Sequence, residues 1–457
     1  MAIAVVRDGK IVYAKGFGVR KIGTTLRVDR YTVFELGSVS KSLSSTIVAG
    51  EVGTGILQWS DPISKEIAGF TLRDPWVGSH VTIADMFSHR SGLPDHAGDV
   101  LEDLGFDRGD IINRLRYWPL SPFRISFGYT NYGITTGAQA AANAEHVSWD
   151  ALADDILFKP LGMTSAGYRF SDYESSTNRA WLHLKTAHGW EAGPEDLAAY
   201  DVAAPAGGAH SNVVDMAKWM ILQLNDGSYQ GKQIIAKGPL EETHTPQIVS
   251  GPAGADGRVP FNGLGTALSY DKLGHLRIGH SGAMEQGEAT SYELLPSAKL
   301  GIVVLTNGFP IGVPESIIQM FYDRVEFGHY QRDWLAFYGE AFKAASAQLL
   351  GKLVGKTPPA NAPAARPNEA YVGTYANDLY GPATISAAAT GLNLTIGPKH
   401  MVFPLRHWSG DTFVFRPGGG GFRAVSELTF LAASGGHPAQ LTIEWLNESG
   451  LGTFTKE

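Results

Sequence analysis

The sequence predicts an α+β domain, with helices flanking an antiparallel sheet, followed by a small all-β domain. Three observations lead to this fold class. β-Prone runs occur at the start of the chain and again near residue 300, and helical patterns dominate between them, which is typical of α+β domains. A proline-rich stretch at 356–368 precedes a series of short β-type runs. The 457 residues also exceed the ~250–300 that one hydrophobic core usually spans, so two cores are expected.

The first predicted element is a β-hairpin. Residues 3–6 and 11–13 are β-prone and flank Asp8-Gly9, a dipeptide that supplies the positive φ angles of a tight primed turn. Residues 1–18 lack the basic start, apolar core and cleavage site of a signal peptide. We therefore expect the chain to begin inside a folded domain.

The middle of the chain is predicted to be helical, and strands return late. Strands are expected at 291–295 and 301–305, with a polar turn between them, followed by helices at about 314–328 and 333–353. These late strands would join the hairpin in one sheet and complete the larger domain over residues 1–355.

The four prolines of 356–368 predict an extended, semi-stiff linker, and glycine-punctuated β-type runs after it predict a small barrel domain over 369–457. Its clearest strands are expected at 383–386, 392–396, 412–415 and 441–445.

Composition excludes several functions. With 37 Lys and Arg against 45 Asp and Glu, the net charge is −8, and no basic run could follow a nucleic-acid backbone. No apolar stretch approaches the ~18 residues of a membrane span. The absence of cysteine excludes disulfides and thiolate chemistry but does not indicate a compartment.

The strongest local motif is the segment 34–41, which reads FELGSVSK. Val39, Leu43 and Ile47 recur at helical spacing, so Ser38 is expected at a helix N-terminus with Lys41 one turn away. The N–H groups of that helix end would favour negative charge developing near the serine. Taken alone, the pattern favours an N-capping serine and an exposed helix lysine.

The surrounding motifs decide between these interpretations. The segment closely resembles the nucleophile motif of class C β-lactamases and of the wider penicillin-recognising serine hydrolases. Tyr129-Thr130-Asn131 resembles the Tyr-X-Asn element of that family, and His280-Ser281-Gly282 stands where many relatives have Lys-Thr-Gly. Other similar segments are found at 88–94, 159–163 and 205–208. The resemblance covers roughly residues 1–330 and implies a β-lactamase/transpeptidase-like fold with a helical subdomain.

The resemblance implies a serine hydrolase that forms an acyl-enzyme on Ser38. A serine hydroxyl becomes a good nucleophile only when an adjacent base removes its proton. A tyrosine phenol could be this base at neutral pH only if its anion were stabilised by about 4 kcal/mol. A nearby lysine ammonium could provide that stabilisation. We assign Lys41 and Tyr129 to this role jointly. Asn131 would orient Lys41 and bind the substrate amide. The backbone N–H groups of Ser38 and Ala283 would hold the oxyanion, each contributing about 2.7–4 kcal/mol.

The third motif, His280, Ser281 and Gly282, is assigned to substrate binding, and here the chain departs from the usual pattern. A lysine at the first position commonly helps to bind the carboxylate of β-lactams, and histidine carries less positive charge near neutrality. We therefore expect an amide or peptide hydrolase, including one for D-residue-containing or linearised cyclic peptides. A carboxylesterase or a weak β-lactamase is the alternative.

Three rival interpretations stay open at this point. The segment 279–283 also fits a nucleophile elbow around Ser281, which requires a strand, a sharp turn and a helix. His89, Asp95 and His96 lie close in sequence and are the nearest approach to a metal site, although no HEXXH motif is present. A penicillin-binding sensor without turnover is the third interpretation. We expect no metal and no cofactor.

The C-terminal region resembles the lipocalin-like barrel that follows the catalytic domain in some relatives, and it is expected to be structural or to join subunits of a homo-oligomer. The expected substrate partner is a small peptide, amide or ester. Relatives usually begin with a helix ahead of the first strand. Localisation therefore stays unknown, and a periplasmic or secreted protein fits if an upstream segment precedes this sequence.

Overall fold

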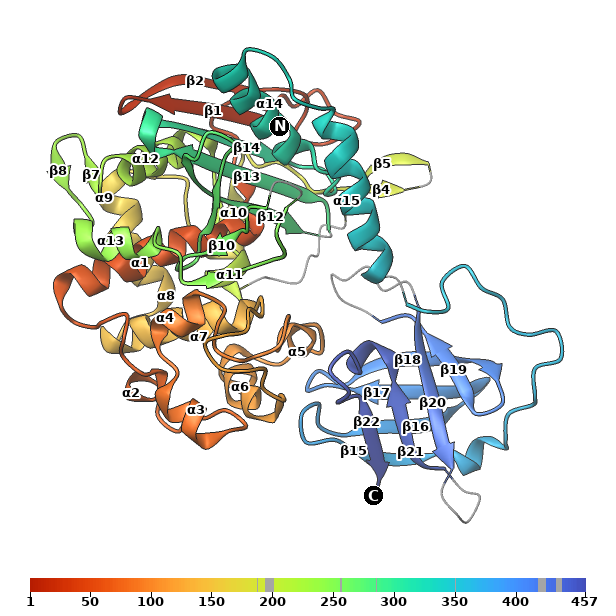
Figure 1. Ribbon diagram of the computed structural model, residues 1–457. Coiled ribbons are helices and arrows are strands. Elements are labelled where there is room, and N and C mark those ends of the chain that lie inside the picture. Colours follow the sequence, from red (N-terminus) through yellow and green to blue (C-terminus); the bar gives the residue numbers. More distant parts are fainter. Residues whose placement is uncertain are drawn as a thin grey trace. The chain divides into compact units, whose positions relative to one another are not determined.

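The computed structural model describes residues 1–186, 188–193, 201–254, 257–284, 286–349, 351–417, 425–432 and 438–457 (Figure 1). Its internal contacts divide the chain into two compact units. The first comprises Met1–Asp95 and Leu120–Phe342, and the second comprises His96–Pro119 and Lys343–Glu457.

The centre of the first unit is an eight-stranded antiparallel sheet with the strand order β2-β1-β14-β13-β12-β11-β10-β9. Both ends of the unit contribute to it, because the N-terminal strand β1 pairs with the late strand β14. This confirms the predicted fold class. The strands are β1 (Ala2–Arg7), β2 (Lys10–Gly16), β9 (Ile248–Val249), β10 (Phe261–Asn262), β11 (Ala267–Tyr270), β12 (Leu276–Met284), β13 (Glu288–Leu295) and β14 (Leu300–Thr306).

The predicted hairpins are present. Asp8 and Gly9 have φ angles of 49° and 72°, so both central residues adopt the left-handed backbone that a primed turn requires. The predicted strands near 291–295 and 301–305 are β13 and β14, joined by the short 3₁₀ turn η4 (Pro296–Ala298) and Lys299.

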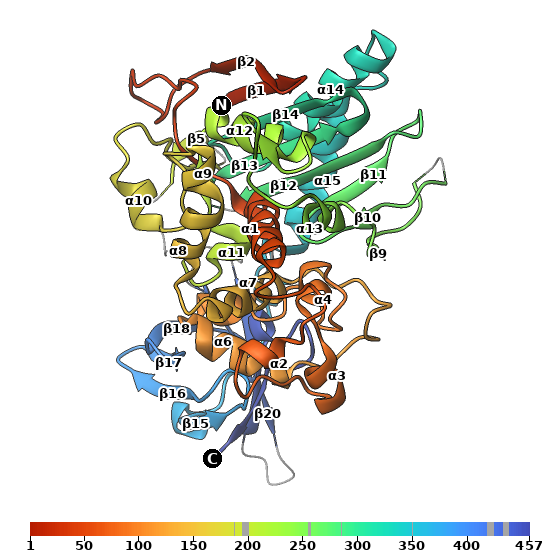
Figure 2. The same cartoon turned by 90° about the vertical axis from the view of Figure 1, so that its left-hand side faces the viewer.

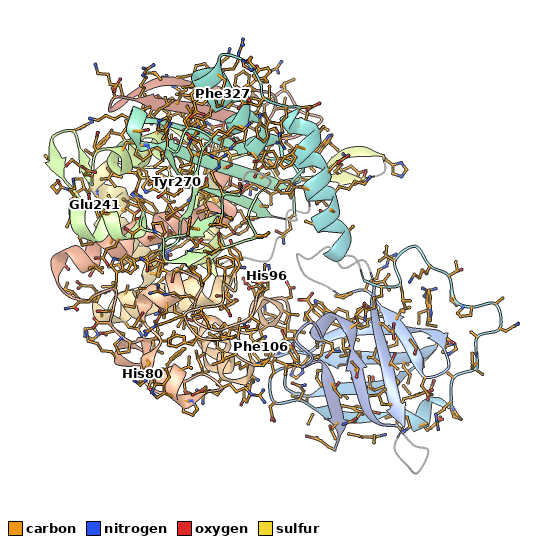
Figure 3. All side chains as sticks on the ribbon, in the orientation of Figure 1. His80, His96, Phe106, Glu241, Tyr270 and Phe327 are labelled. Atoms are coloured by element: carbon orange, nitrogen blue, oxygen red, sulfur yellow. The ribbon has the colours of Figure 1, made fainter. Side chains whose placement is uncertain are left out.

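Helices cover both faces of the sheet (Figures 1 and 2). On one face, Ile302 and Val304 of β14 pack against Ile318 of α14 (Val313–Phe327). Side chains alternate along a strand, and on the other face a side chain at Gly301 would meet Met220 of α12 (Val213–Leu224). Side chains fill the space between these layers (Figure 3).

Helix α1 (Ser40–Thr54) is buried over most of its length, and the predicted stripe Val39, Leu43 and Ile47 is fully buried. Its polar residues also have partners: Ser42 donates to Gly265 O at 2.8 Å and accepts from the Tyr292 hydroxyl of β13 at 2.8 Å. Buried hydroxyls are tolerated when they are hydrogen-bonded, so this contact fixes the helix against the sheet.

A group of helices packs around α1, in agreement with the predicted helical subdomain. Contacts join α4 (Ile83–Phe87) to α7 (Asn131–Ala144), and α7 and α11 (Ala204–Gly207) to α1. Further α-helices of the first unit are α2 (Ile63–Glu66), α3 (Pro75–His80), α8 (Trp149–Ala153), α9 (Lys159–Leu161), α10 (Phe170–Ser175) and α13 (Lys237–Thr243). Helix α15 (Trp334–Leu349) follows α14, close to the predicted 333–353.

The second unit contains a closed antiparallel barrel of the strands β15 to β22. The strand predicted at 441–445 is present but ends earlier: β21 ends at Ile443, and Glu444–Leu446 form a 3₁₀ turn that buries Trp445 and Leu446. The strands are β15 (Gly373–Ala376), β16 (Ala383–Ala388), β17 (Gly391–Ile396), β18 (Met401–Ser409), β19 (Thr412–Phe415), β20 (Ser426–Ala432), β21 (Pro438–Ile443) and β22 (Thr453–Lys456).

Two further segments pack on this barrel within the second unit. The segment His96–Pro119 includes α5 (Asp99–Asp103) and α6 (Arg108–Arg114), and Arg114 donates to the Leu379 carbonyl oxygen at 2.6 Å. In the proline-rich stretch, Arg366 forms an ion pair with Asp411 at 3.1 Å. The boundaries at 1–355, 356–368 and 369–457 stay a prediction. No helix in the described ranges is long and apolar enough to cross a bilayer.

Candidate active site

Ser38 lies in the 3₁₀ turn η1 (Gly37–Val39), which leads directly into α1. The residues at the two N-cap positions are Leu36 and Val39, and neither makes a side-chain cap hydrogen bond. Ser38 is therefore not the capping residue that its sequence context alone would favour. It is presented at the start of a buried helix, as the motif predicts.

Lys41 lies one helical turn from Ser38 and is completely buried. Its Nζ donates to Ser38 Oγ at 2.9 Å and to the Ala206 carbonyl oxygen at 2.8 Å. A buried ammonium is costly unless it is hydrogen-bonded, and both acceptors meet that need. Ala206 belongs to α11, within the 205–208 segment whose similarity to the family was noted in the sequence.

Tyr129 and His280 complete the cluster. The Lys41 ammonium is 4.8 Å from the centre of the Tyr129 ring, within the range of a cation–π interaction. The ring centres of Tyr129 and His280 are 6.3 Å apart. The structure thus brings together Ser38, Lys41, Tyr129 and His280, which come from three separate parts of the sequence.

Two residues with no predicted role in the site hold the backbone around Tyr129. The Tyr129 N–H donates to Asp95 Oδ1 at 2.6 Å, and the Thr130 N–H donates to His89 Nδ1 at 3.2 Å. The buried His89 ring also packs against the Tyr129 ring, with 4.6 Å between centres. Asn131 follows as the first residue of α7. In the sequence, the family similarity of 88–94 includes His89, whereas Asp95 was considered only as a metal ligand.

These contacts also bear on the metal interpretation. His89 and Asp95 accept backbone hydrogen bonds, and His96 Nδ1 pairs with Asp99 Oδ2 at 2.8 Å. Over the described ranges, the one group of side chains with metal-ligand spacing is a different trio, Asp271, His275 and Glu326. Arg277 forms ion pairs with both carboxylates of that trio.

We predict that Asp95→Ala lowers kcat about tenfold with little change in KM, because it removes the acceptor that positions the Tyr129 backbone. Steady-state kinetics with a p-nitrophenyl ester measure both constants. Asp95→Asn is the matched control, since its side-chain oxygen can accept the same hydrogen bond. Equal losses in the two variants would show that carboxylate charge, rather than positioning, is what matters.

The predicted oxyanion donors lie where η1 approaches β12. A Cβ placed on Gly37 would come within 2.9 Å of Ala283 N, and one placed on Gly282 within 3.0 Å of Ser38 N. Gly37 also has a positive φ angle of 51°. Glycine is therefore needed at both positions for the two backbones to come so close. As a result, the backbone segment that contains Ser38 lies beside the segment that contains Ala283.

Ser281 differs from its neighbours in the third motif. Side chains alternate along β12, so the Ser281 side chain points away from the face that carries His280. Its hydroxyl donates to Ser291 Oγ of β13 at 3.2 Å. The strand runs unbroken from Leu276 to Met284 and has no turn into a helix at Ser281, so the nucleophile-elbow interpretation is wrong.

The half-buried His280 ring favours its neutral form at physiological pH. Burial and the positive charge of Lys41 lower its pKa from 6.5 to about 4, against a smaller opposite effect of its hydrogen bond to the Ser281 carbonyl. The third motif therefore carries no fixed cation at neutrality. This agrees with the expectation that it binds a carboxylate less strongly than lysine does.

We predict that His280→Gln leaves the shape of the pH profile of kcat/KM unchanged between pH 5.5 and 8, because His280 does not titrate there. Its effect on stability has a defined sign. The unfolded chain binds this proton below about pH 6.5 and the native protein only below about pH 4, so this contribution to stability falls as the pH drops from 6.5 to 4. Chemical denaturation at pH 6.5 and at pH 4 should show that the free energy of unfolding falls less in His280→Gln than in the wild type. If the kcat/KM profile of the wild type had an inflection near pH 6.5 that vanished in His280→Gln, the lowered pKa of His280 would be contradicted.

Two buried carboxyl groups lie close to the nucleophile segment. Glu35, in β3 (Phe34–Glu35), and Glu288 of β13 are almost completely buried. Burial raises the pKa of both side chains well above the usual range, and each has a second acidic neighbour, Asp201 and Glu35 respectively. The neutral forms are thereby favoured, so these groups add little negative charge to compete with an oxyanion.

Comparison with known proteins supplies the family. The family model described as Beta-lactamase matches residues 1–318, and one described as a domain of unknown function, DUF3471, matches residues 357–451. Penicillin-binding protein 4 of Amycolatopsis lactamdurans is 28% identical over 82% of this chain and 92% of its own length. Unguisins hydrolase ungD of Aspergillus violaceofuscus is 23% identical over 99% of this chain and 86% of its own length.

Solved structures agree on the fold. The octameric penicillin-binding protein homologue from Pyrococcus abyssi superimposes with a TM-score of 0.62 at 20% identity, over 97% of this chain and 93% of that one. The crystal structure of SurE gives a TM-score of 0.56 at 21% identity, over 100% and 94%. Because the family model spans more than half of the sequence, the chain belongs to the Beta-lactamase family, whose members are serine hydrolases that act through an acyl-enzyme.

Proposed function

We propose that this protein cleaves an amide or peptide bond through an acyl-enzyme on Ser38. The observation that carries the proposal is the 2.9 Å hydrogen bond from the buried Lys41 ammonium to Ser38 Oγ. A structural lysine would more often keep its charge in water, since burying it has a free-energy cost. Here the charge is directed at a hydroxyl group at the start of a helix.

In the proposed acylation step, Ser38 Oγ attacks the substrate carbonyl carbon and its proton passes to the pair formed by Lys41 and Tyr129. Coupled groups share their titration, so the pair is treated as one base. The carbonyl oxygen becomes an oxyanion bound by the N–H groups of Ser38 and Ala283. The C–N bond then breaks, and the leaving nitrogen takes the proton from the same pair.

Deacylation repeats these roles with water. The Lys41 and Tyr129 pair removes a proton from a water molecule, which attacks the acyl carbon, and Ser38 leaves with that proton restored to Oγ. Asn131 is assigned to orienting Lys41 and binding the substrate amide, and His280 to binding substrate at the edge of β12. No step in this sequence requires a cofactor.

The substrate class is proposed from the third motif and from relatives. His280 is neutral at pH 7, which favours an amide or peptide over a β-lactam recognised through its carboxylate. One curated relative is named a hydrolase of unguisins, and another, 23% identical over 68% of this chain and 80% of its own length, is the D-alanyl-D-alanine-carboxypeptidase/endopeptidase AmpH of Escherichia coli. These names support peptides containing D-residues or linearised cyclic peptides as the first substrates to test.

Turnover of three substrates tests the proposal: a D-alanyl anilide, a p-nitrophenyl ester and nitrocefin. The highest kcat/KM is expected for the anilide. A higher value for the ester would instead indicate a carboxylesterase, and a higher value for nitrocefin a β-lactamase. Stoichiometric labelling by penicillin without turnover of any substrate would favour a penicillin-binding sensor.

A further inference from the structure

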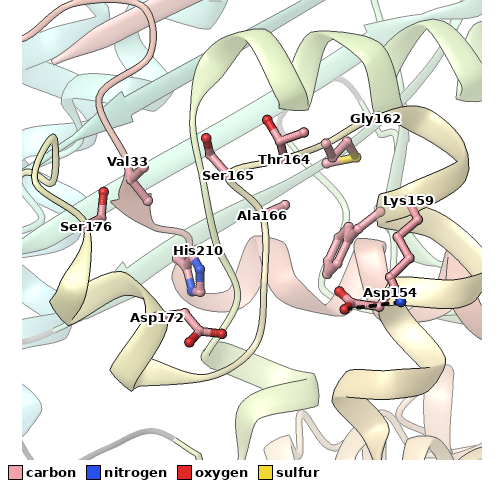
Figure 4. A pocket seen from close by; sticks show the side chains of 12 residues that line it. Val33, Asp154, Lys159, Gly162, Thr164, Ser165, Ala166, Asp172, Ser176 and His210 are labelled. Atoms are coloured by element: carbon pink, nitrogen blue, oxygen red, sulfur yellow. Dashed lines mark ion pairs between the residues drawn. The ribbon is translucent and has the colours of Figure 1, made fainter.

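A cavity of about 650 Å³ lies in the first unit, and its lining contains none of the candidate catalytic residues. Its walls come from β6 (His210–Ser211), from α10 and from the chain around α9 (Figure 4). This volume lies in the range of about 300–1,000 Å³ that is typical of small-molecule sites.

Part of the cavity lining is apolar. Val33, Phe158 and Met163 line it, and each side chain is at most 4% exposed over the whole molecule. Such a surface suits an aliphatic or aromatic group of a ligand, since the apolar area that it removes from water favours binding.

His210 provides a polar group in this wall. Its side chain is 4% exposed, and its Nδ1 has no hydrogen-bond partner among the described residues. Burial lowers the pKa of His210 to about 4, against an opposing effect of Asp172, so the ring is neutral at pH 7. A buried polar atom without a partner is costly, and a ligand donor is one way to satisfy it.

The charge at the mouth is negative. Asp172 is exposed, lines the cavity and lies beside His210 (Figure 4). The cation in the lining, Lys159, has its charge compensated by Asp154 at 3.8 Å and Asp155 at 2.7 Å. Arg169 also interacts electrostatically with Asp172, but it is not in the lining and forms an ion pair with Asp150 at 3.2 Å. An anionic ligand would therefore meet Asp172 with no uncompensated cation in the lining, whereas an ammonium group would be attracted.

We propose that this cavity binds an amphipathic primary amine, with the ammonium group at Asp172 and His210 and the apolar group against Val33, Phe158 and Met163. The ligand is distinct from the substrate of Ser38. Its recognition requires both ends of the molecule, a positive charge and an apolar group about the size of a phenyl ring.

Methyl NMR of the full-length protein labelled with [¹³C-methyl]methionine tests this proposal, with 2-phenylethylamine as the probe. The Met163 resonance is assigned by its loss in Met163→Leu. We expect saturable shifts of that resonance with the amine, and at least tenfold weaker binding of 2-phenylethanol and of 3-phenylpropionate.

Variants separate this cavity from the Ser38 site. Asp172→Asn should weaken binding at least tenfold. Glu174→Gln, which changes another exposed carboxylate of α10 outside the cavity lining, should not. Ser38→Ala should also bind normally, so a failed hydrolase proposal would leave this result intact. No saturable Met163 shift, or equal binding of the amine and the alcohol, would overturn the proposal.

Discussion

Replacing Ser38 by alanine is expected to lower kcat by about 10⁴-fold or more while the protein stays folded, because the variant lacks the oxygen that becomes acylated. Ser38 Oγ accepts one hydrogen bond from Lys41, and Lys41 keeps a second acceptor in the Ala206 carbonyl. Thermal unfolding should therefore change little. Hydrolysis of the preferred substrate and a melting curve measure the two quantities.

Ser281→Ala is the matched control for this experiment. It removes a serine hydroxyl three residues from the end of β12, on the opposite face of the strand from His280, where it bonds to Ser291. We expect its kcat to stay within about twofold of the wild type, in line with the loss of one neutral hydrogen bond away from the reacting atoms. If Ser281→Ala were inactive and Ser38→Ala fully active, the assignment of the nucleophile would be reversed.

Replacing Lys41 by alanine is expected to lower kcat by about 10³-fold, which is within the usual contribution of a positioned base. The change removes the cation beside Ser38 Oγ and the Tyr129 ring. It also leaves the buried Ala206 carbonyl without this donor, so a loss of about 1–3 kcal/mol in the free energy of unfolding is expected. Kinetics and urea denaturation measure the two effects.

Lys218→Ala separates catalysis from stability. Lys218 of α12 also bonds to a backbone carbonyl, that of Gly162, and forms an ion pair with Asp215 at 2.7 Å. It is expected to lower stability without lowering kcat. If Lys41→Ala were also to lose only stability, the lysine would be structural and the proposed base would have to be Tyr129 alone.

Local sequence patterns predicted much of the fold. Asp8-Gly9 predicted the first hairpin because a primed turn needs positive φ angles, and both residues have them. The stripe of Val39, Leu43 and Ile47 predicted a buried helix because its spacing matches one helical face. These features depend on neighbours within a few residues, which a sequence shows directly.

Contacts between distant segments could not be predicted in this way. Ala206 lies 165 positions from its partner Lys41, and Asp95 lies 34 positions from its partner Tyr129. Each pair comes together only in the folded chain. The orientation of Ser281 was missed because the motif gives residue order but not the face of the strand. The homo-oligomer expected through residues 369–457 stays a prediction.

The central claim is that Ser38 is the nucleophile, and covalent labelling tests it most directly. The protein is treated with a fluorophosphonate, its intact mass is measured, and the modified peptide is sequenced. We predict one adduct, located on Ser38 and absent from folded Ser38→Ala. An adduct that persists in folded Ser38→Ala, or that maps to another serine, would contradict the mechanism.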